Sequence, residues 1–362
     1  MPTYTATAVR SPYFIRETGL SGGEVIDVEL RIWNEPDSEP TNATYEFSKT
    51  IPSTLVTEFD LDIAPYCREF IEHSTRYDSD SAILAGDSDA RLEAQDDSWC
   101  YCTVKVYVDT VLTNQGDGYT KTLACFDGFG YYTEGMNPTQ TRYRTPTGIT
   151  YYGNETGNCG GLAYYDDGTI AGSGLQAKYT GLSTGGTTTV NANYTVGYFP
   201  LLHPNYKTEG NTLQYLENTS VVATYTVEAI CETKYTVINC DYVNRYGMWD
   251  RIIFFKNSKR EFSSKGSEYH FKSGSVNYST TAARKRLLNI NGAEMVTCNT
   301  GWVEENYDEK IKDLLLSERI LIDNVPVLLR SSNIELQTSI YDKMINYTIK
   351  FEYAHNQLNY VV

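Results

Sequence analysis

Four histidines are the side chains best suited to acid–base chemistry near neutral pH, and they stand at His73, His203, His270 and His355. None lies in a zinc-binding HExxH pattern or beside the G-x-S-x-G turn of a serine hydrolase. The glycines of GGLAYYDDGTIAGSG lack the GKS or GKT that a phosphate-binding loop requires. We therefore predict that the chain is not an enzyme and has no catalytic residue and no cofactor.

A run of carboxylates offers the chemistry of a hard-cation site. Asp78 and Asp80, and then Asp87 and Asp89, stand two residues apart within residues 77–97. Calcium prefers such oxygen ligands, but an EF-hand would require a further Asp or Asn where Ala82 stands. The favoured interpretation is a solvated acidic loop, so no metal site is predicted, and calcium binding stays open as the alternative.

Eight cysteines provide the only soft metal ligands and redox groups besides methionine. They show no paired CxxC spacing and no His at zinc-ligand distance. Cys100 and Cys102 are two residues apart on one predicted strand, a spacing at which two thiols rarely bridge. We expect buried free thiols, with disulfides or a metal site as less favoured alternatives.

The segment NRYGMWDRIIFFK, residues 244–256, combines three cations with four aromatic residues. Asn244 and Gly247 occupy the first and last positions of a type I turn, with β-rich runs on both sides. We predict a hairpin along whose strands Arg245, Arg251 and Lys256 lie with their charges in water. A nucleic-acid patch is the less favoured interpretation, because the cations are interrupted and the surrounding chain is acidic.

Net charge limits the classes of partner. The chain carries a formal charge of -16, which opposes binding to phosphate polyanions. Residues 1–230 hold 13 Lys and Arg against 30 Asp and Glu, whereas residues 231–362 hold 17 against 16. The N-terminus shows no secretory signal, and no window approaches the apolar length of a membrane helix. We expect no specific nucleic-acid binding, no membrane association and synthesis in the cytoplasm.

Strands must position most of these groups. Apolar residues alternate with polar ones in residues 25–33, 221–229 and 345–353, which is typical of half-buried antiparallel strands. Helical spacing occurs only near residues 64–73 and near residues 308–319. The predicted fold is mostly β, with antiparallel sandwich or barrel modules and one or two short helices.

Changes in composition suggest three modules. We predict an N-terminal β module at 1–125, a loop or small β-subdomain at 126–215 and a C-terminal β module at 216–362. The middle module is rich in Gly, Tyr, Thr and Asn and has few cations. A weak likeness between the outer modules leaves an internal repeat open as an alternative.

Aromatic residues next to small polar groups are frequent in protein and glycan interfaces. On this ground residues of the middle module and of the hairpin rim are candidates for an interface role, and ordinary sheet or loop packing is the favoured interpretation. These candidates are Tyr131, Tyr132, Tyr164, Tyr165, Arg245, Tyr246 and Trp249.

Several longer stretches suggest a family. They are VRSPYFIRETG, FDLDIAPYCREFIE, ACFDGFGYYTEGMNP, VNRYGMWDRIIFFKNSKREF, MVTCNTGWVEENYDEKIKDLLLSERILI, VPVLLRSSNIELQ and YTIKFEYAHN. Together they resemble structural proteins of tailed bacteriophages, especially phages that are marine or infect Bacteroidetes. The resemblance covers most of the chain except the Gly-rich middle.

This resemblance implies a virion protein of the tail or baseplate that assembles as a symmetric ring or hub. Its partners would be copies of itself and other tail proteins, and its location would be the virion after synthesis in the host cytoplasm. The alternative function is a carbohydrate-binding adhesin or receptor-binding module that recognises a glycan of the host surface.

Overall fold

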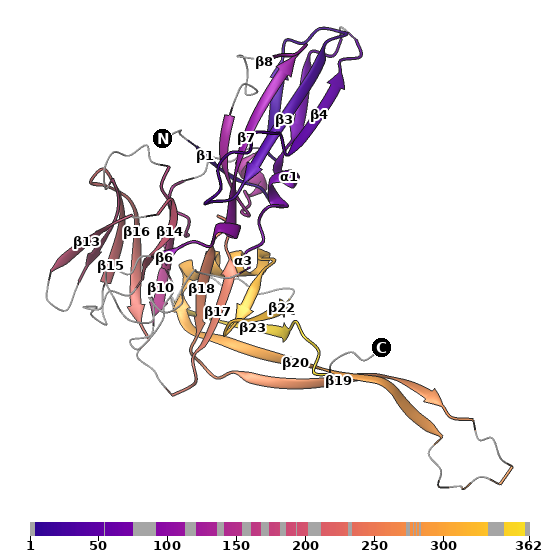
Figure 1. Cartoon of the computed structure of the whole chain (residues 1–362). Coiled ribbons are helices and arrows are strands. Elements are labelled where there is room, and N and C mark those ends of the chain that lie inside the picture. The colour runs from indigo at the N-terminus through magenta and orange to yellow at the C-terminus, as the bar shows by residue number, and fades with distance from the viewer. Residues whose placement is uncertain are drawn as a thin grey trace. The chain divides into compact units, whose positions relative to one another are not determined.

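A computed structural model gives the structure of this chain (Figure 1). It describes residues 4–53, 55–74, 92–112, 121–135, 141–153, 161–167, 174–181, 186–192, 194–201, 211–230, 234–272, 276–277, 279, 281, 284–331 and 344–358. The chain forms two compact units. The first unit comprises residues 1–231, 242–251 and 306–318, and the second comprises residues 232–241, 252–305 and 319–362. The first unit thus includes two of the three predicted modules, and the three-module division stays a prediction.

The first unit begins with a six-stranded sheet in the order β1-β9-β7-β3-β4, with β8 paired to β7. β1 runs parallel to β9, and the other pairs are antiparallel. In β3, Ile26 and Leu30 are buried completely, whereas Asp27 and Glu29 point to the opposite face. The strands are β1 (Thr5–Ala8), β3 (Val25–Trp33), β4 (Tyr45–Thr50), β7 (Trp99–Val108), β8 (Val111–Leu112) and β9 (Lys121–Phe126).

A two-stranded ladder and a short helix contribute to the core of this sheet. The ladder pairs β2 (Phe14–Thr18) with β5 (Glu58–Asp62), and the helix is α1 (Ala64–Arg68) with Pro65 in its first turn. Four buried free cysteines, Cys67, Cys100, Cys102 and Cys125, belong to the same core. Among the described residues, Cys240 and Cys298 are also buried and free, so these six confirm the expected buried thiols.

Two further sheets follow in the first unit, in the orders β10-β16-β15-β12-β13 and β11-β14-β6. The described part of the Gly-rich middle is therefore mostly strand. These strands are β6 (Leu92–Glu93), β10 (Thr150–Gly153), β11 (Gly161–Tyr165), β12 (Leu175–Thr180), β13 (Thr187–Asn191), β14 (Val196–Pro200), β15 (Asn211–Glu217) and β16 (Ser220–Ala229).

Tyrosine fills the interior between these strands. The hydroxyl of Tyr215 donates to the carbonyl of Ala163 at 2.7 Å, and that of Tyr179 donates to the carbonyl of Pro200 at 2.6 Å. The hydroxyl of Tyr225 donates to the carbonyl of Thr145 at 2.9 Å. A buried ring adds apolar area while its hydroxyl satisfies a backbone acceptor, so tyrosine forms a core here without an unpaired polar group.

A seven-stranded sheet holds most of the second unit, in the order β18-β17-β21-β22-β23-β20-β19. Ile345, Ile349 and Phe351 of its strand β23 are buried at alternate positions, as their period predicts. The strands are β17 (Ile238–Val243), β18 (Trp249–Phe254), β19 (Lys259–His270), β20 (Lys285–Glu304), β21 (Ile320–Ile322), β22 (Val325–Leu329) and β23 (Met344–Tyr353).

The second predicted helix is present as α3 (Asp308–Leu316), which belongs to the first unit. Asp308 and Glu309 lie in its first turn, where the helix dipole favours carboxylates. Three short 3-10 turns complete the described elements: η1 (Asp96–Ser98), η2 (Tyr132–Glu134) and η3 (Glu305–Tyr307). The fold is mostly β with multiple sheets and two helices, which confirms the predicted fold class.

Candidate interaction surface

Strands β19 and β20 extend as a long two-stranded ribbon (Figure 1). β20 pairs with β23 only from Met295 to Glu304, so its earlier residues pair with β19 alone among the described strands. We call residues 264–272 and 284–290 the arm. Every residue of the arm is exposed. Two-stranded ribbons are marginally stable in water by themselves, so a ribbon of this kind calls for a partner.

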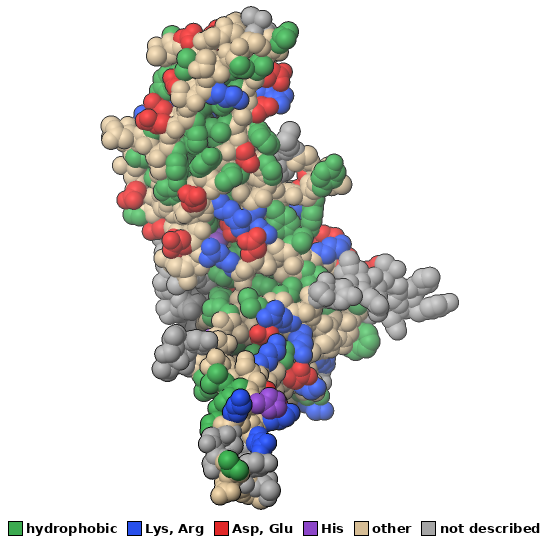
Figure 2. All heavy atoms as spheres, turned by 90° about the vertical axis from the view of Figure 1, so that its right-hand side faces the viewer, with side chains coloured by type: hydrophobic (Ala, Val, Ile, Leu, Met, Phe, Trp, Pro, Cys, Tyr) green, Lys and Arg blue, Asp and Glu red, His purple; other side chains and the backbone are tan. Residues whose placement is uncertain are grey.

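The arm combines large apolar residues with positive charge. Its five Lys and Arg residues and its single carboxylate give a net charge of +4 in a chain of -16. Figure 2 shows Lys and Arg side chains together with apolar ones at the foot of the view, over this ribbon. The exposed apolar side chains are Tyr269, Phe271, Leu287, Leu288 and Ile290, with exposed fractions between 39% and 60%.

The strand register sorts these side chains onto two faces. Tyr269 pairs with Arg286, and the amide of Phe271 donates to the carbonyl of Arg284 at 2.6 Å. Alternate residues share a face, so both arginines lie with both aromatic rings. The guanidinium carbon of Arg286 is 4.5 Å from the ring centroid of Phe271. Arg and Tyr are enriched among the residues that contribute most binding energy in protein interfaces, and Phe is enriched in the composition of such interfaces.

The opposite face of the arm is partly neutralised. Lys285 forms an ion pair of 2.9 Å with Glu268, and Leu287 lies across from Glu268. A register shift between Lys265 and Ser267 marks the base of the arm. Such bulges change the twist of a ribbon and re-aim its side chains.

The predicted hairpin rim forms as expected around its turn. The amide of Gly247 donates to the carbonyl of Asn244 at 3.0 Å, and Gly247 has φ +78°. Arg245 pairs with Glu134 at 2.6 Å, and its guanidinium carbon lies 4.6 Å from the ring centroid of Tyr131. The predicted turn is therefore confirmed, but the prediction that the charge of Arg251 lies in water was wrong, because every residue of β18 is buried.

Four of the seven predicted interface residues lie at the surface or only partly below it. Tyr132 is fully exposed, while Tyr131, Arg245 and Tyr246 are half-buried. Arg245 lies near the rings of both Tyr131 and Tyr246. Burial raises the pKa of Tyr131 to about 12, so its phenol stays neutral at physiological pH. Their interface role stays a prediction.

The other three predicted interface residues lie in the core. Tyr164, Tyr165 and Trp249 have exposed fractions of 0%, 2% and 2%. Tyr164 packs against Phe199 with ring centroids 4.5 Å apart, and Tyr165 packs against Phe126 at 5.5 Å. Their prediction as surface groups was wrong, because the sheets of the middle region bury tyrosine in their core, and Trp249 begins β18, in which every residue is buried.

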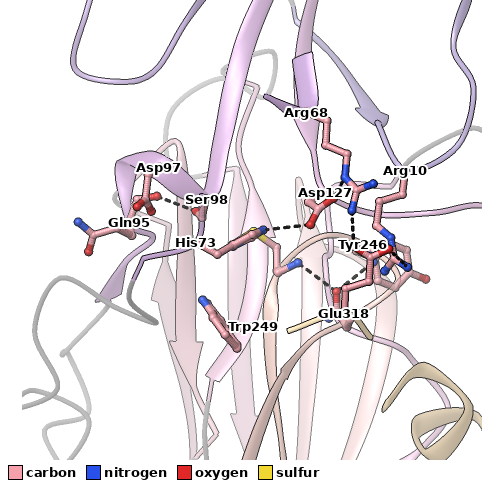
Figure 3. Close-up of polar contacts among 12 residues, drawn as sticks. Arg10, Arg68, His73, Gln95, Asp97, Ser98, Asp127, Tyr246, Trp249 and Glu318 are labelled. Carbon is pink, nitrogen blue, oxygen red and sulfur yellow. Dashed lines mark hydrogen bonds and ion pairs between the residues drawn. The ribbon is translucent and has the colours of Figure 1, made fainter. Parts of the chain in front are cut away.

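A polar network joins Arg68 of α1, Asp127 just after β9 and Glu318 just after α3 (Figure 3). Arg68 Nε lies 3.0 Å from Asp127 Oδ1, and the imidazole Nε2 of His73 lies 3.9 Å from Asp127 Oδ2. Arg10 and Arg68 both pair with Glu318. Ser98, shown in the same view, donates its hydroxyl to the carbonyl of Gln95 at 2.6 Å. The two arginines and two carboxylates neutralise one another, so the network holds these segments of the first unit together.

A second charged cluster lies wholly inside the first unit. Lys310 Nζ is 3.1 Å from Asp250 Oδ1 and 3.7 Å from the ring centroid of Tyr151. Tyr242 donates its hydroxyl to Asp250 Oδ2 at 3.4 Å. Burial raises the pKa of nearby Asp313 to about 7, although the backbone amide of Arg245 donates to it.

Sequence reasoning missed this cluster, although a signal existed. Lys310 and Asp313 stand on the same stretch of helix as the apolar Ile311 and Leu314, and all four are buried. Charged residues at positions that an amphipathic helix turns inward indicate a buried ion pair.

The described residues contain no cluster suited to a metal ion and no helix suited to a membrane. No group of three or more His, Cys, Asp or Glu side chains there could hold a metal ion. None of the described helices has the length and apolarity needed to cross a membrane. The acidic segment considered for calcium lies mostly outside the described residues.

The chain was also compared with known proteins. No family model matches it, and no curated protein matches it.

Proposed function

We propose that this chain is a structural virion protein of a tailed bacteriophage, a tail or baseplate subunit that assembles as a symmetric oligomer. The observation that carries the assembly part of this proposal is the arm. It exposes Tyr269, Phe271 and Leu288 on one face of a ribbon and Leu287 on the other. Native proteins usually cover such exposed strands with another element or another subunit.

The charge distribution supports self-association. The arm carries +4 while the whole chain carries -16, so the remainder of each copy is strongly acidic. Complementary charge accelerates and orients association between copies. The phage origin rests on the sequence resemblance, and the other proposed partners are neighbouring tail proteins.

Solution mass tests the assembly. Light scattering of the purified protein at several concentrations, with a cross-linked sample as control, is expected to give a discrete oligomer. A monomer at every concentration would contradict the proposal. Mass spectrometry of purified phage particles tests the location, because a structural subunit must be present in many copies per particle.

The described residues do not favour the adhesin. The tyrosines that suggested a glycan surface include Tyr164 and Tyr165, which are buried. Saturable sugar binding by the monomer on a glycan array would nevertheless support the adhesin over the assembly subunit.

A further inference from the structure

A groove of about 510 Å³ lies on the six-stranded sheet of the first unit. Its lining includes Asp27 and Glu29 of β3, Glu46 and Phe47 of β4, and Tyr107 of β7. Three carboxylates line it and no cationic side chain does. The groove is therefore acidic. Tyr107 is the aromatic residue on its carboxylate face, because Phe47 pairs with buried Val28 and packs against the core on the other face of the sheet.

Two of its carboxylates face each other across the strands. Glu29 of β3 is the direct cross-strand partner of Glu46 in β4. Like charges at such positions repel each other and destabilise the pair. Arg31 lies 3.2 Å from Glu29, and Lys105 is the cross-strand partner of Glu29 on β7, so these two cations offset part of this repulsion. An added cation at Glu46 would relieve more of it.

The arm has the complementary chemistry at the same spacing. Arg284 and Arg286 are two residues apart on one face, as Asp27 and Glu29 are on β3. Residues two apart in a strand are separated by roughly 6.6 to 6.8 Å, so two arginines can meet two carboxylates in register. Tyr269, Phe271 and Leu288 of the same face would lie against the ring of Tyr107, which shares a face with Asp27. Aliphatic groups such as Leu288 fit a protein partner better than a nucleic acid.

We propose that the arm of one copy binds this groove on a second copy of the chain. The inference rests on the proposed self-assembly and names the two surfaces that carry it. The contact joins two different surfaces, so it is head-to-tail and generates a ring if the rotation closes.

Charge reversal tests the pairing. An arm variant carries Arg284→Glu and Arg286→Glu, and a groove variant carries Asp27→Lys and Glu29→Lys. For each variant alone, we expect the association constant, measured by sedimentation velocity, to be at least tenfold lower than that of the wild type. An equimolar mixture of the two is expected to regain association, because each reversed surface then meets its complement.

A matched control keeps the total charge change but leaves the arm intact. Lys259→Glu with Arg260→Glu reverses two exposed cations of β19 outside the arm and is expected to assemble like the wild type. Circular dichroism melting establishes that each variant folds. If the groove variant does not fold, the single exposed change Glu46→Lys takes its place.

A second measurement does not depend on variants. Cross-linking of a mixture of light and heavy-isotope copies with an amine reagent that has a spacer is expected to join Lys285, on the outer face of the bound arm, to Lys105, the β7 partner of Glu29, between copies. Links found only within one copy would overturn the proposal.

The remaining outcomes separate this inference from the proposed function. If the wild type assembles and the arm variant assembles equally well, the arm–groove contact is wrong and the assembly proposal stands. If the wild type stays monomeric, both fail. If the arm variant loses only affinity for duplex DNA, the arm is a nucleic-acid ribbon and the proposal is overturned.

Discussion

The β17–β18 hairpin and the arm follow each other along the chain, and both combine aromatic residues with cations. Every residue of β18 is buried, from Trp249 to Phe254, whereas every residue of the arm is exposed. The same antiparallel pairing therefore serves two purposes. In the first hairpin, packing satisfies the aromatic side chains within the chain, and in the second, those side chains remain available to a partner.

Removing an aromatic ring should give the largest difference between the two hairpins. Phe254 is buried and packs against Phe351 with ring centroids 6.0 Å apart. Phe254→Ala is expected to cost about 4 kcal/mol of unfolding free energy, because it leaves a cavity. Phe271→Ala in the arm should cost less than about 0.5 kcal/mol. Urea unfolding at low protein concentration measures both changes in unfolding free energy. Equal losses for the two variants would contradict the distinction between a buried and an exposed hairpin.

The buried ion pair between Lys310 of α3 and Asp250 of β18 should give the next largest effect. Lys310→Ala leaves the Asp250 carboxylate in the core without its ammonium partner, at a cost of about 3 kcal/mol. The control is Lys312→Ala, which removes partly exposed pairs to Asp308 and Glu309 and should cost less than about 0.5 kcal/mol. Denaturant midpoints compare the two, and similar losses would show that burial does not matter here.

The turn of the buried hairpin is sharply constrained. A Cβ at Gly247 would lie 2.6 Å from the backbone amide of Asp127, at φ +78°. Gly247→Ala is expected to lose about 2 kcal/mol or more, since strain and a backbone clash combine. Gly19 has the same φ and open space around it, so Gly19→Ala isolates the strain alone. Thermal unfolding of both variants should rank Gly247→Ala as clearly less stable.

Asp313 should make stability depend on pH. Its folded pKa is about 7 and the unfolded value is about 3.9, so the folded state binds a proton more strongly. The stabilisation is fully present below about pH 4 and is lost as pH rises through about 7. Asp313→Asn should remove this loss and raise stability near pH 8 by about 1 to 2 kcal/mol. Urea unfolding at about pH 5 and pH 8 measures it, and parallel profiles of variant and wild type would contradict the assignment.

Much of the architecture was predictable from local pattern. The alternation of Ile26, Val28, Leu30 and Ile32 identified a strand and its buried face, and both helices occur where their spacing placed them. The turn at Asn244–Gly247 was predictable from its residue types. The arm was not recognised as an interaction element, because its Ser, Lys and Leu alternate no differently from those of a half-buried strand.

What the amino-acid sequence determined by itself is the period of each strand, the glycine at a positive-φ turn and the excess of carboxylates in residues 1–230. These follow from local sterics and from composition. Only the tertiary structure decided which strand faces are covered. It buried Tyr164, Tyr165 and Trp249, enclosed Lys310 with Asp250, and left Phe271 exposed. The period of a strand tells which side a residue occupies, but the free energy of burial depends on what packs against that side.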